Sequence, residues 1–116
     1  MKTSEPPLGV EPAAWDRLTP FQRLVYRAVC RIPKGQVRSY RWVARRIGRP
    51  RAARAVGNAL NHNPFAPRVP CHRVVRADGS LGGFAGGPAR KRRLLRREGA
   101  GAVALSRVNG WLERKD

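Results

Sequence analysis

The chain has 116 residues, which fits one domain, and 41% of them are hydrophobic, enough for a small core. Lysine and arginine number 25 against 7 aspartates and glutamates, so the formal net charge is +18. This charge favours a polyanionic partner, nucleic acid first and an anionic membrane surface second. No long apolar run, lipidation signal or secretion signal is visible, which argues against the membrane and for a cytoplasmic protein. A biased genomic base composition is an alternative source of the arginine excess.

The N-terminal part combines a proline-rich segment with the first helix signal. Residues 1–12 are rich in proline and polar side chains, and we expect a loose arm there. Thr19 and Pro20 suit the N-cap and the first position of a helix over 21–30. The proline and glycine within 32–35 are expected to end this helix.

The next two helices form a recognisable pair. Ser39 suits the N-cap of a helix over 40–47, and a glycine-containing turn separates it from a helix over 51–60. Two short helices joined in this way are typical of a helix-turn-helix, whose second helix enters a DNA groove. Arg51 and Arg54 would lie in the first turn of that second helix, with small alanines between them. A helical hairpin with a solvated basic face is the alternative, and the charge of the chain favours DNA binding.

A tetrapeptide at 70–73, Pro70-Cys71-His72-Arg73, places a thiol directly beside an imidazole. Cysteine attacks electrophiles as the thiolate, and a nearby base or cation raises the thiolate fraction. The flanking proline and valines predict a strand or a turn here rather than the middle of a helix. The pattern suggests nucleophilic chemistry on a polyanion, and a buried structural cysteine is the alternative.

The two cysteines, Cys30 and Cys71, are both expected to be reduced thiols, although one disulfide is arithmetically possible. Cys30 lies in an apolar stretch and is typical of a core residue. A zinc site needs four ligands at close spacing, which Cys30, His62, Cys71 and His72 do not offer. We therefore predict no metal site.

A glycine-rich stretch at 79–87 follows the cysteine. Such a loop can bring backbone N–H groups close to a ligand, but it lacks the spacing and the lysine of a P-loop. A flexible connector is an equal alternative. Pro88 is expected to begin a last helix that ends near Arg97, with Glu98 and Gly99 closing it.

The helices are expected to be amphipathic, each with an apolar face toward one core. The apolar positions expected in these helices are Leu24, Val25, Ala28, Val29, Trp42, Val43, Ile47, Ala52, Ala55, Val56, Ala59, Leu94 and Leu95. We divide the chain into an arm (1–18), a main domain (19–99) and a C-terminal extension (100–116) that holds a weaker apolar segment.

Short motifs along the chain occur in the order and spacing of one known family. They are Pro20-Phe21-Gln22, Ile32-Pro33-Lys34-Gly35, Ser39-Tyr40, Ala53-Arg54-Ala55-Val56-Gly57, Asn63-Pro64, Pro70-Cys71-His72-Arg73-Val74-Val75, Gly82-Gly83-Phe84-Ala85-Gly86-Gly87, and Lys91 through Leu94-Leu95 to Glu98-Gly99. The segment from about Thr19 to Gly99 resembles the C-terminal domain of O6-alkylguanine-DNA alkyltransferases and of their non-transferring alkyltransferase-like relatives.

The resemblance implies a mainly helical, winged helix-turn-helix domain with a small β element. It also implies that the protein binds duplex DNA from the minor groove and rotates a damaged nucleotide out of the stack. Arg54 matches the arginine that fills the gap. Tyr40 matches the tyrosine that meets the flipped guanine and a nearby phosphate, and the helix start near Arg51 would favour phosphate.

The resemblance assigns a chemical role to each of four polar side chains. Cys71 matches the thiol that accepts the alkyl group, and His72 matches the histidine that takes the thiol proton, usually through a water. Glu98 matches the carboxylate that orients this histidine, in the logic of a catalytic triad. Asn63 matches the asparagine that organises the active-site turn.

Backbone groups complete the implied base-binding site. The carbonyls of Cys71 and Val74 would accept hydrogen bonds from the guanine amino group, and the Phe84-Ala85 backbone would lie near O6. We include Arg73 among the candidate DNA-binding residues, although the resemblance implies that it supports the structure rather than contacts the base. At Phe84-Ala85 the family often has Tyr-Ser, so a hydroxyl is missing at each position.

The resemblance implies direct DNA repair: Cys71 takes the alkyl group from O6 of guanine in double-stranded DNA, once per molecule and without a cofactor. The protein is expected to act as a monomer at the nucleoid. Only the residues before Thr19 precede the match, so we expect no N-terminal domain, as in the alkyltransferase-like proteins. Those relatives replace the acceptor cysteine with tryptophan or alanine, whereas this chain keeps Cys71. A sensor that passes the lesion to excision-repair proteins is the alternative, and a basic architectural DNA-binding protein is a third.

Overall fold

The computed structural model describes residues 6–78, 80–84 and 86–99. In this part the chain is mainly helical and has a small two-stranded sheet, which confirms the predicted fold class. The elements are α1 (Pro12–Asp16), α2 (Pro20–Cys30), β1 (Arg38–Ser39), α3 (Tyr40–Arg46), α4 (Ala53–Asn61), the 3₁₀ helix η2 (Cys71–Arg73), β2 (Val74–Val75) and α5 (Pro88–Arg97).

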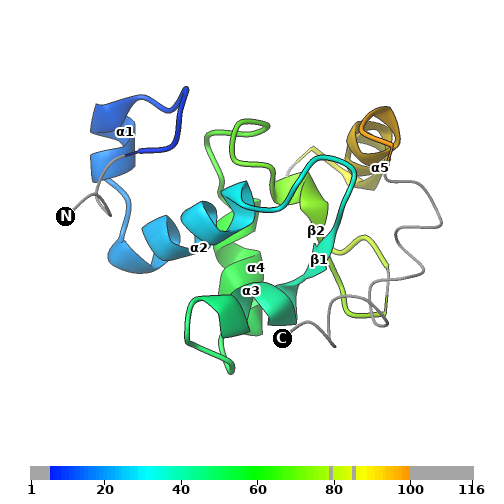
Figure 1. Cartoon of the computed structure of the whole chain (residues 1–116), viewed down its shortest axis with the longest axis horizontal. Coiled ribbons are helices and arrows are strands. Elements are labelled where there is room, and N and C mark those ends of the chain that lie inside the picture. Colours follow the sequence, from blue (N-terminus) through cyan, green and yellow to red (C-terminus); the bar gives the residue numbers. More distant parts are fainter. Residues whose placement is uncertain (1–5, 79, 85, 100–116) are drawn as a thin grey trace.

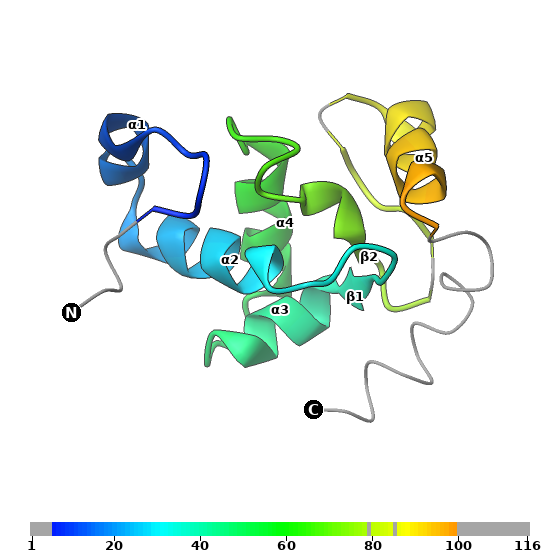
Figure 2. The ribbon, with the colours of Figure 1, turned by 45° about the horizontal axis from the view of Figure 1, so that its top comes forward.

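The helices α2, α3 and α4 pack against one another at the centre of the molecule (Figure 1). The two views place α1 and α5 at opposite ends, with the small sheet between the central helices and α5 (Figure 2). None of the described helices is long and apolar enough to cross a bilayer.

The helix starts that the sequence predicts at Thr19 and Ser39 are confirmed. Thr19 Oγ1 accepts a hydrogen bond from the Gln22 N–H (3.1 Å), and Gln22 Oε1 accepts one from the Thr19 N–H (2.9 Å), which together form a capping box at the start of α2. Ser39 Oγ accepts from the Trp42 N–H at 2.9 Å and begins α3. These local contacts position the helix-turn-helix.

The start of α4 differs from the sequence prediction, which placed Arg51 in its first turn. The Ala52 N–H donates to Arg49 O at 2.9 Å, so residues 49–52 form a turn, and Pro50 suits its second position. The helix therefore begins at Ala53, with Arg54 in its first turn, and Arg51 lies exposed in the preceding turn.

The strands β1 and β2 pair in parallel, with Arg38 opposite Val74 and Ser39 opposite Val75. Ser39 is also the residue that caps α3, and Val74 directly follows the turn that carries Cys71. The sheet therefore ties the start of the helix-turn-helix to the segment that holds the thiol.

Two expected core positions are wrong. Leu24 is 40% exposed, and Ala55 is also exposed. Each of these residues precedes a fully buried valine by one position, which is a rotation of about 100° on a helix. The buried faces of α2 and α4 are centred on Val25 and Val56.

The sequence did not predict α1. Trp15 on this helix is fully buried, with its ring centroid 6.5 Å from that of Tyr26 and 6.2 Å from that of Phe65. Val10, within the segment expected to be a loose arm, is 7% exposed and belongs to the same core. Residues before Thr19 therefore contribute to the core.

Substitution of Trp15 by alanine is expected to lower the free energy of unfolding by about 3–5 kcal/mol, because it removes a large, fully buried ring from the core. Chemical denaturation measures this loss. Leu8→Ala is the matched control, since Leu8 is 98% exposed and its loss should change stability by less than about 0.5 kcal/mol. Equal effects of the two substitutions would show that α1 does not pack as described.

Candidate active site

The thiol and the imidazole lie on η2, a single 3₁₀ turn that precedes β2. The Cys71 N–H donates to Val69 O at 2.8 Å, and the Arg73 N–H donates to Pro70 O at 2.9 Å. Cys71 is 6% exposed and His72 is 1% exposed. The backbone thus holds both side chains on a tight turn, as expected for this segment, and keeps them largely out of water.

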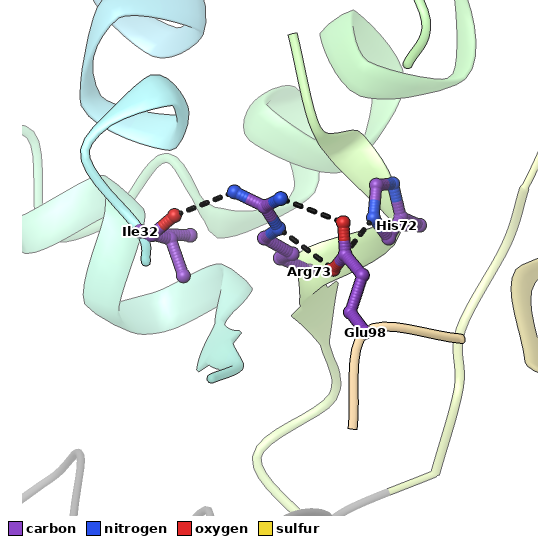
Figure 3. Close-up of polar contacts among 4 residues, drawn as sticks. All are labelled: Ile32, His72, Arg73 and Glu98. Carbon is purple, nitrogen blue, oxygen red and sulfur yellow. Dashed lines mark hydrogen bonds and ion pairs between the residues drawn. The ribbon is translucent and has the colours of Figure 1, made fainter. Parts of the chain in front are cut away.

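One carboxylate joins His72 to Arg73 (Figure 3). Glu98 Oε1 lies 3.0 Å from His72 Nε2, and the Arg73 guanidinium binds both carboxylate oxygens, with Nε to Oε1 at 2.9 Å and Nη2 to Oε2 at 2.6 Å. Arg73 Nη1 also donates to Ile32 O at 2.8 Å. The cluster connects the segment after α2, the turn η2 and the end of α5.

The contact between His72 Nε2 and Glu98 Oε1 is close, but it lacks the geometry of a well-formed hydrogen bond. This contact favours the tautomer that carries its proton on Nε2. His72 Nδ1 is buried and has no hydrogen-bond partner among the described residues. In this tautomer Nδ1 is a free acceptor.

The electrostatic balance of the pair favours a neutral imidazole beside a charged carboxylate. Burial, together with the Arg73 and Lys91 charges, lowers the pKa of His72 although the nearby Glu98 carboxylate raises it. Burial alone would raise the pKa of Glu98, but its polar contacts with Arg73 and His72, and the charges of these two groups, outweigh burial and lower that pKa. A neutral imidazole oriented by a carboxylate can accept a proton.

The Cys71 thiol is not a thiolate by default. Burial raises its pKa, against the lowering effects of the Asn63 hydrogen bond and the Lys91 charge. Asn63 also connects two parts of the loop, since its Nδ2 donates to Val69 O at 2.8 Å and its Oδ1 accepts from the Phe65 N–H at 2.9 Å. A thiol in this state needs a base before it can react at neutral pH.

Sequence reasoning gave no role to Lys91, which is fully buried. Its ammonium donates to Leu81 O, to Gly83 O at 3.3 Å and to the Tyr40 hydroxyl at 3.4 Å. It also lies 5.7 Å from the Tyr40 ring centroid and 6.0 Å from that of Phe84. Burial lowers the pKa of Lys91 to about 8. Lys91 thus fastens the glycine-rich loop to α5 and places a positive charge near Cys71.

Two hollows meet at this loop. A pocket of about 200 Å³ lies beside the thiol and is lined by Leu60, Asn63, Pro64, Ala66, Pro67, Cys71, Phe84, Gly86, Arg90 and Leu94. A wider groove of about 590 Å³ is lined by Tyr40, Ala53, Arg54, Gly57, Asn58, Asn61, Arg76 and Gly83. Gly83 belongs to the groove and Phe84 to the pocket, so adjacent loop residues border the two spaces.

The structure brings together the four side chains that the resemblance assigns to chemistry. Cys71 and Asn63 line the pocket, and His72, on the same turn as Cys71, contacts Glu98 in the cluster with Arg73. Among residues 6–78, 80–84 and 86–99, no three histidine, cysteine, aspartate or glutamate side chains gather in a way that could hold a metal ion.

The residues expected to face DNA lie in different parts of the structure. Tyr40 and Arg54 line the groove, and Phe84 lines the thiol pocket. Exposed Arg51 is not part of the groove lining, and Val74 is fully buried in β2. Two further expectations concern Arg73 and Ala85. Arg73 points inward to Glu98 and Ile32, so its geometry is that of a buttress, and Ala85 lies outside the described residues.

Comparison with known proteins gives one consistent family. The model of the 6-O-methylguanine DNA methyltransferase DNA-binding domain matches residues 20–100. A methylated-DNA–protein-cysteine methyltransferase of Mycobacterium bovis is 53% identical over 88 residues, which cover 76% of this chain and 53% of that protein. The enzyme of the same name from Salmonella typhimurium is 56% identical over 81 residues, 70% of this chain and 47% of that protein. The chain spans about half the length of these relatives.

Solved structures agree with the sequence comparison. Mycobacterium tuberculosis OGT in complex with DNA has a TM-score of 0.70 and 52% identity, covering 77% of this chain and 57% of that one. S. pombe Atl1, in complex with damaged DNA containing O6-carboxymethylguanine, has a TM-score of 0.65 and 39% identity. The match covers 72% of this chain and 79% of that one. The family match over most of the chain, at this level of identity, decides the assignment: the chain belongs to the 6-O-methylguanine DNA methyltransferase family through its DNA-binding domain.

Proposed function

We propose that this protein repairs DNA by direct transfer of an alkyl group from O6 of guanine to Cys71. The observation that carries the proposal is the thiol at a pocket wall, on the same turn as a histidine that contacts a partly buried carboxylate. The name of the relatives at 53–56% identity and the DNA complex of the mycobacterial neighbour support it. The retained cysteine favours transfer over sensing alone.

The chemistry follows from the protonation states of the site. Neutral His72 takes the proton of the Cys71 thiol, through a water or directly, and Glu98 stabilises the imidazolium that forms. The sulfur then attacks the alkyl carbon. The S–C bond forms, the C–O6 bond breaks, and its electron pair stays on the guanine, which regains one proton and leaves as the normal base. A thioether is a poor leaving group, so each molecule reacts once and no cofactor takes part.

The groove beside α4 is the proposed DNA-binding surface. Arg54 is exposed in the first turn of α4, where it can enter the duplex and replace the extruded base. Tyr40, which also lines the groove, would meet the flipped nucleotide. We propose that the carbonyls of Cys71 and Val74 and the Phe84-Ala85 backbone bind the guanine. The protein would act as a monomer, since one chain supplies the thiol, the base and the carboxylate. Its proposed DNA substrate would place it at the nucleoid.

Mass spectrometry after incubation with duplex DNA containing O6-methylguanine tests the proposal. The protein should gain one methylene unit of mass, located on the Cys71 peptide, and an unmodified duplex should leave it unchanged. Tight lesion binding with an unchanged mass would instead indicate a sensor that hands the lesion to excision-repair proteins. Equal affinity for damaged and undamaged duplex would indicate an architectural DNA-binding protein.

Arg54→Ala is expected to slow alkyl transfer by about 10²-fold, because an unstacked base costs a few kcal/mol unless a side chain takes its place. Affinity for undamaged duplex should fall far less, and the slope of log K against log salt should change by about one. Fluorescence of a base analogue at the flipped position measures base flipping. Anisotropy titrations at several salt concentrations measure DNA affinity and its salt dependence. Exposed Arg17, at the end of α1, provides the matched control Arg17→Ala, which should leave transfer near wild type. Equal losses in the two variants would remove Arg54 from the flipping step.

A further inference from the structure

The pocket beside Cys71 is larger than a methyl group requires. Its volume is about 200 Å³, below the range of about 300–1,000 Å³ typical of drug-sized ligands but enough for a substituent of several atoms. Most of its wall is apolar, formed by Leu60, Pro64, Ala66, Pro67, Phe84 and Leu94. If the base arrives from the groove at Tyr40 and Arg54, this pocket remains for the group carried on O6.

One cation borders this pocket on α5. Arg90 is exposed, and its side-chain stem lies against the glycine-rich loop: an added Cβ at Gly86 would be only 2.6 Å from Arg90 Cδ and 3.2 Å from the Phe84 ring. The glycine therefore permits a close approach that a larger residue would block. This contact holds the stem of Arg90 at the pocket wall, and its guanidinium has no hydrogen bond or ion pair with the described residues.

The charges around the pocket have one sign. None of the described residues that line the pocket is an aspartate or a glutamate, and buried Lys91 adds a second positive charge near Cys71. The carboxylate of Glu98 does not line the pocket and is bound by Arg73 and His72. Burying a carboxylate without a partner is costly, so an apolar pocket would reject one unless a cation is placed to pair with it.

We propose that Arg90 makes this protein selective for O6-alkyl groups that end in a carboxylate, of which carboxymethyl is the smallest. The proposal rests on the transfer reaction proposed above and names its substrate class. In the transfer, the Cys71 sulfur bonds to the methylene carbon, the bond from that carbon to O6 breaks, and the electron pair stays on guanine. The product is S-carboxymethylcysteine, and guanine regains one proton. Arg90 pairs with the carboxylate throughout and gives up no proton.

The test compares three duplexes that differ only at O6 of one guanine: methyl, carboxymethyl, and carbamoylmethyl, the neutral amide of nearly the same size. Single-turnover rates at subsaturating protein give the selectivity. We expect the wild type to prefer carboxymethyl over carbamoylmethyl by about fivefold, the effect of one partly exposed charge pair. Arg90→Met, which keeps an apolar stem, should bring the ratio of carboxymethyl to carbamoylmethyl transfer to about one.

Arg92→Met is the matched control, because Arg92 is an exposed arginine on the same helix that does not line the pocket. It should keep the wild-type ratio. A wild-type ratio of one or less, or equal slowing of all three substrates in Arg90→Met, would overturn the selectivity proposal. Absence of methyl transfer in the wild type would instead overturn the proposed function, so the two failures are distinguishable.

Discussion

Cys71→Ala is expected to abolish alkyl transfer and to leave affinity for DNA near wild type. Cys71 is the one thiol in the pocket lining, and alanine offers no nucleophile there. The substitution leaves the groove residues Tyr40 and Arg54 untouched. Intact-protein mass after incubation with O6-methylguanine duplex measures transfer, and anisotropy with the same duplex measures binding.

Cys30→Ala is the matched control for this experiment, since it makes the same chemical change at the other cysteine. Cys30 ends α2, is partly buried and does not line the pocket, and burial raises its pKa. This variant should still gain the alkyl mass. Transfer by Cys71→Ala, or loss of transfer in a folded Cys30→Ala protein, would show that the wrong sulfur has been assigned.

The parts of the fold that the sequence predicted well depend on neighbouring residues. Thr19 and Ser39 bond to backbone groups three residues away, so their caps can be inferred from a short stretch of sequence. The turn that holds Cys71 and His72 likewise follows from the proline before it and the valines after it.

The parts that were missed depend on contacts between distant segments. Trp15 lies on a short helix whose burial depends on Tyr26 and Phe65. The bidentate pair of Arg73 and Glu98 joins residues 25 positions apart, so no local pattern distinguishes this inward arginine from a DNA-facing one.

Lys91 is a different case, because a local signal was available. It lies four residues before fully buried Leu95, on the same face of α5, whereas the neighbouring arginines are exposed. Helical spacing therefore indicated that its stem points inward. The position of its ammonium among the carbonyls of Leu81 and Gly83 depends on the path of the loop.

Glu98→Gln is expected to slow transfer by about 10²- to 10⁴-fold, the usual contribution of general base catalysis. The Glu98 charge raises the pKa of His72, so its removal lowers that pKa and makes the imidazole a weaker base. A base works only when it is unprotonated, so the acid limb of the rate profile should move to lower pH. Single-turnover rates across pH measure both effects. The loss of the pair with Arg73 also costs stability, so chemical denaturation is needed to check that Glu98→Gln is folded at every pH used.

Arg73→Gln tests whether the charges around His72 tune its pKa or only stabilise the fold. Its effect on the pKa of His72 should be opposite in sign to that of Glu98→Gln. The Arg73 charge lowers the pKa of His72, so its removal should raise that pKa and move the acid limb to higher pH. NMR titration of the histidine resonances, assigned with His62→Gln, should show the same two directions in the unreacted protein. If both variants only lose stability and the His72 titration stays in place, the Glu98 carboxylate serves the fold and does not tune the base. Opposite shifts would show that Arg73 and Glu98 together set the proton affinity of the group that activates the thiol.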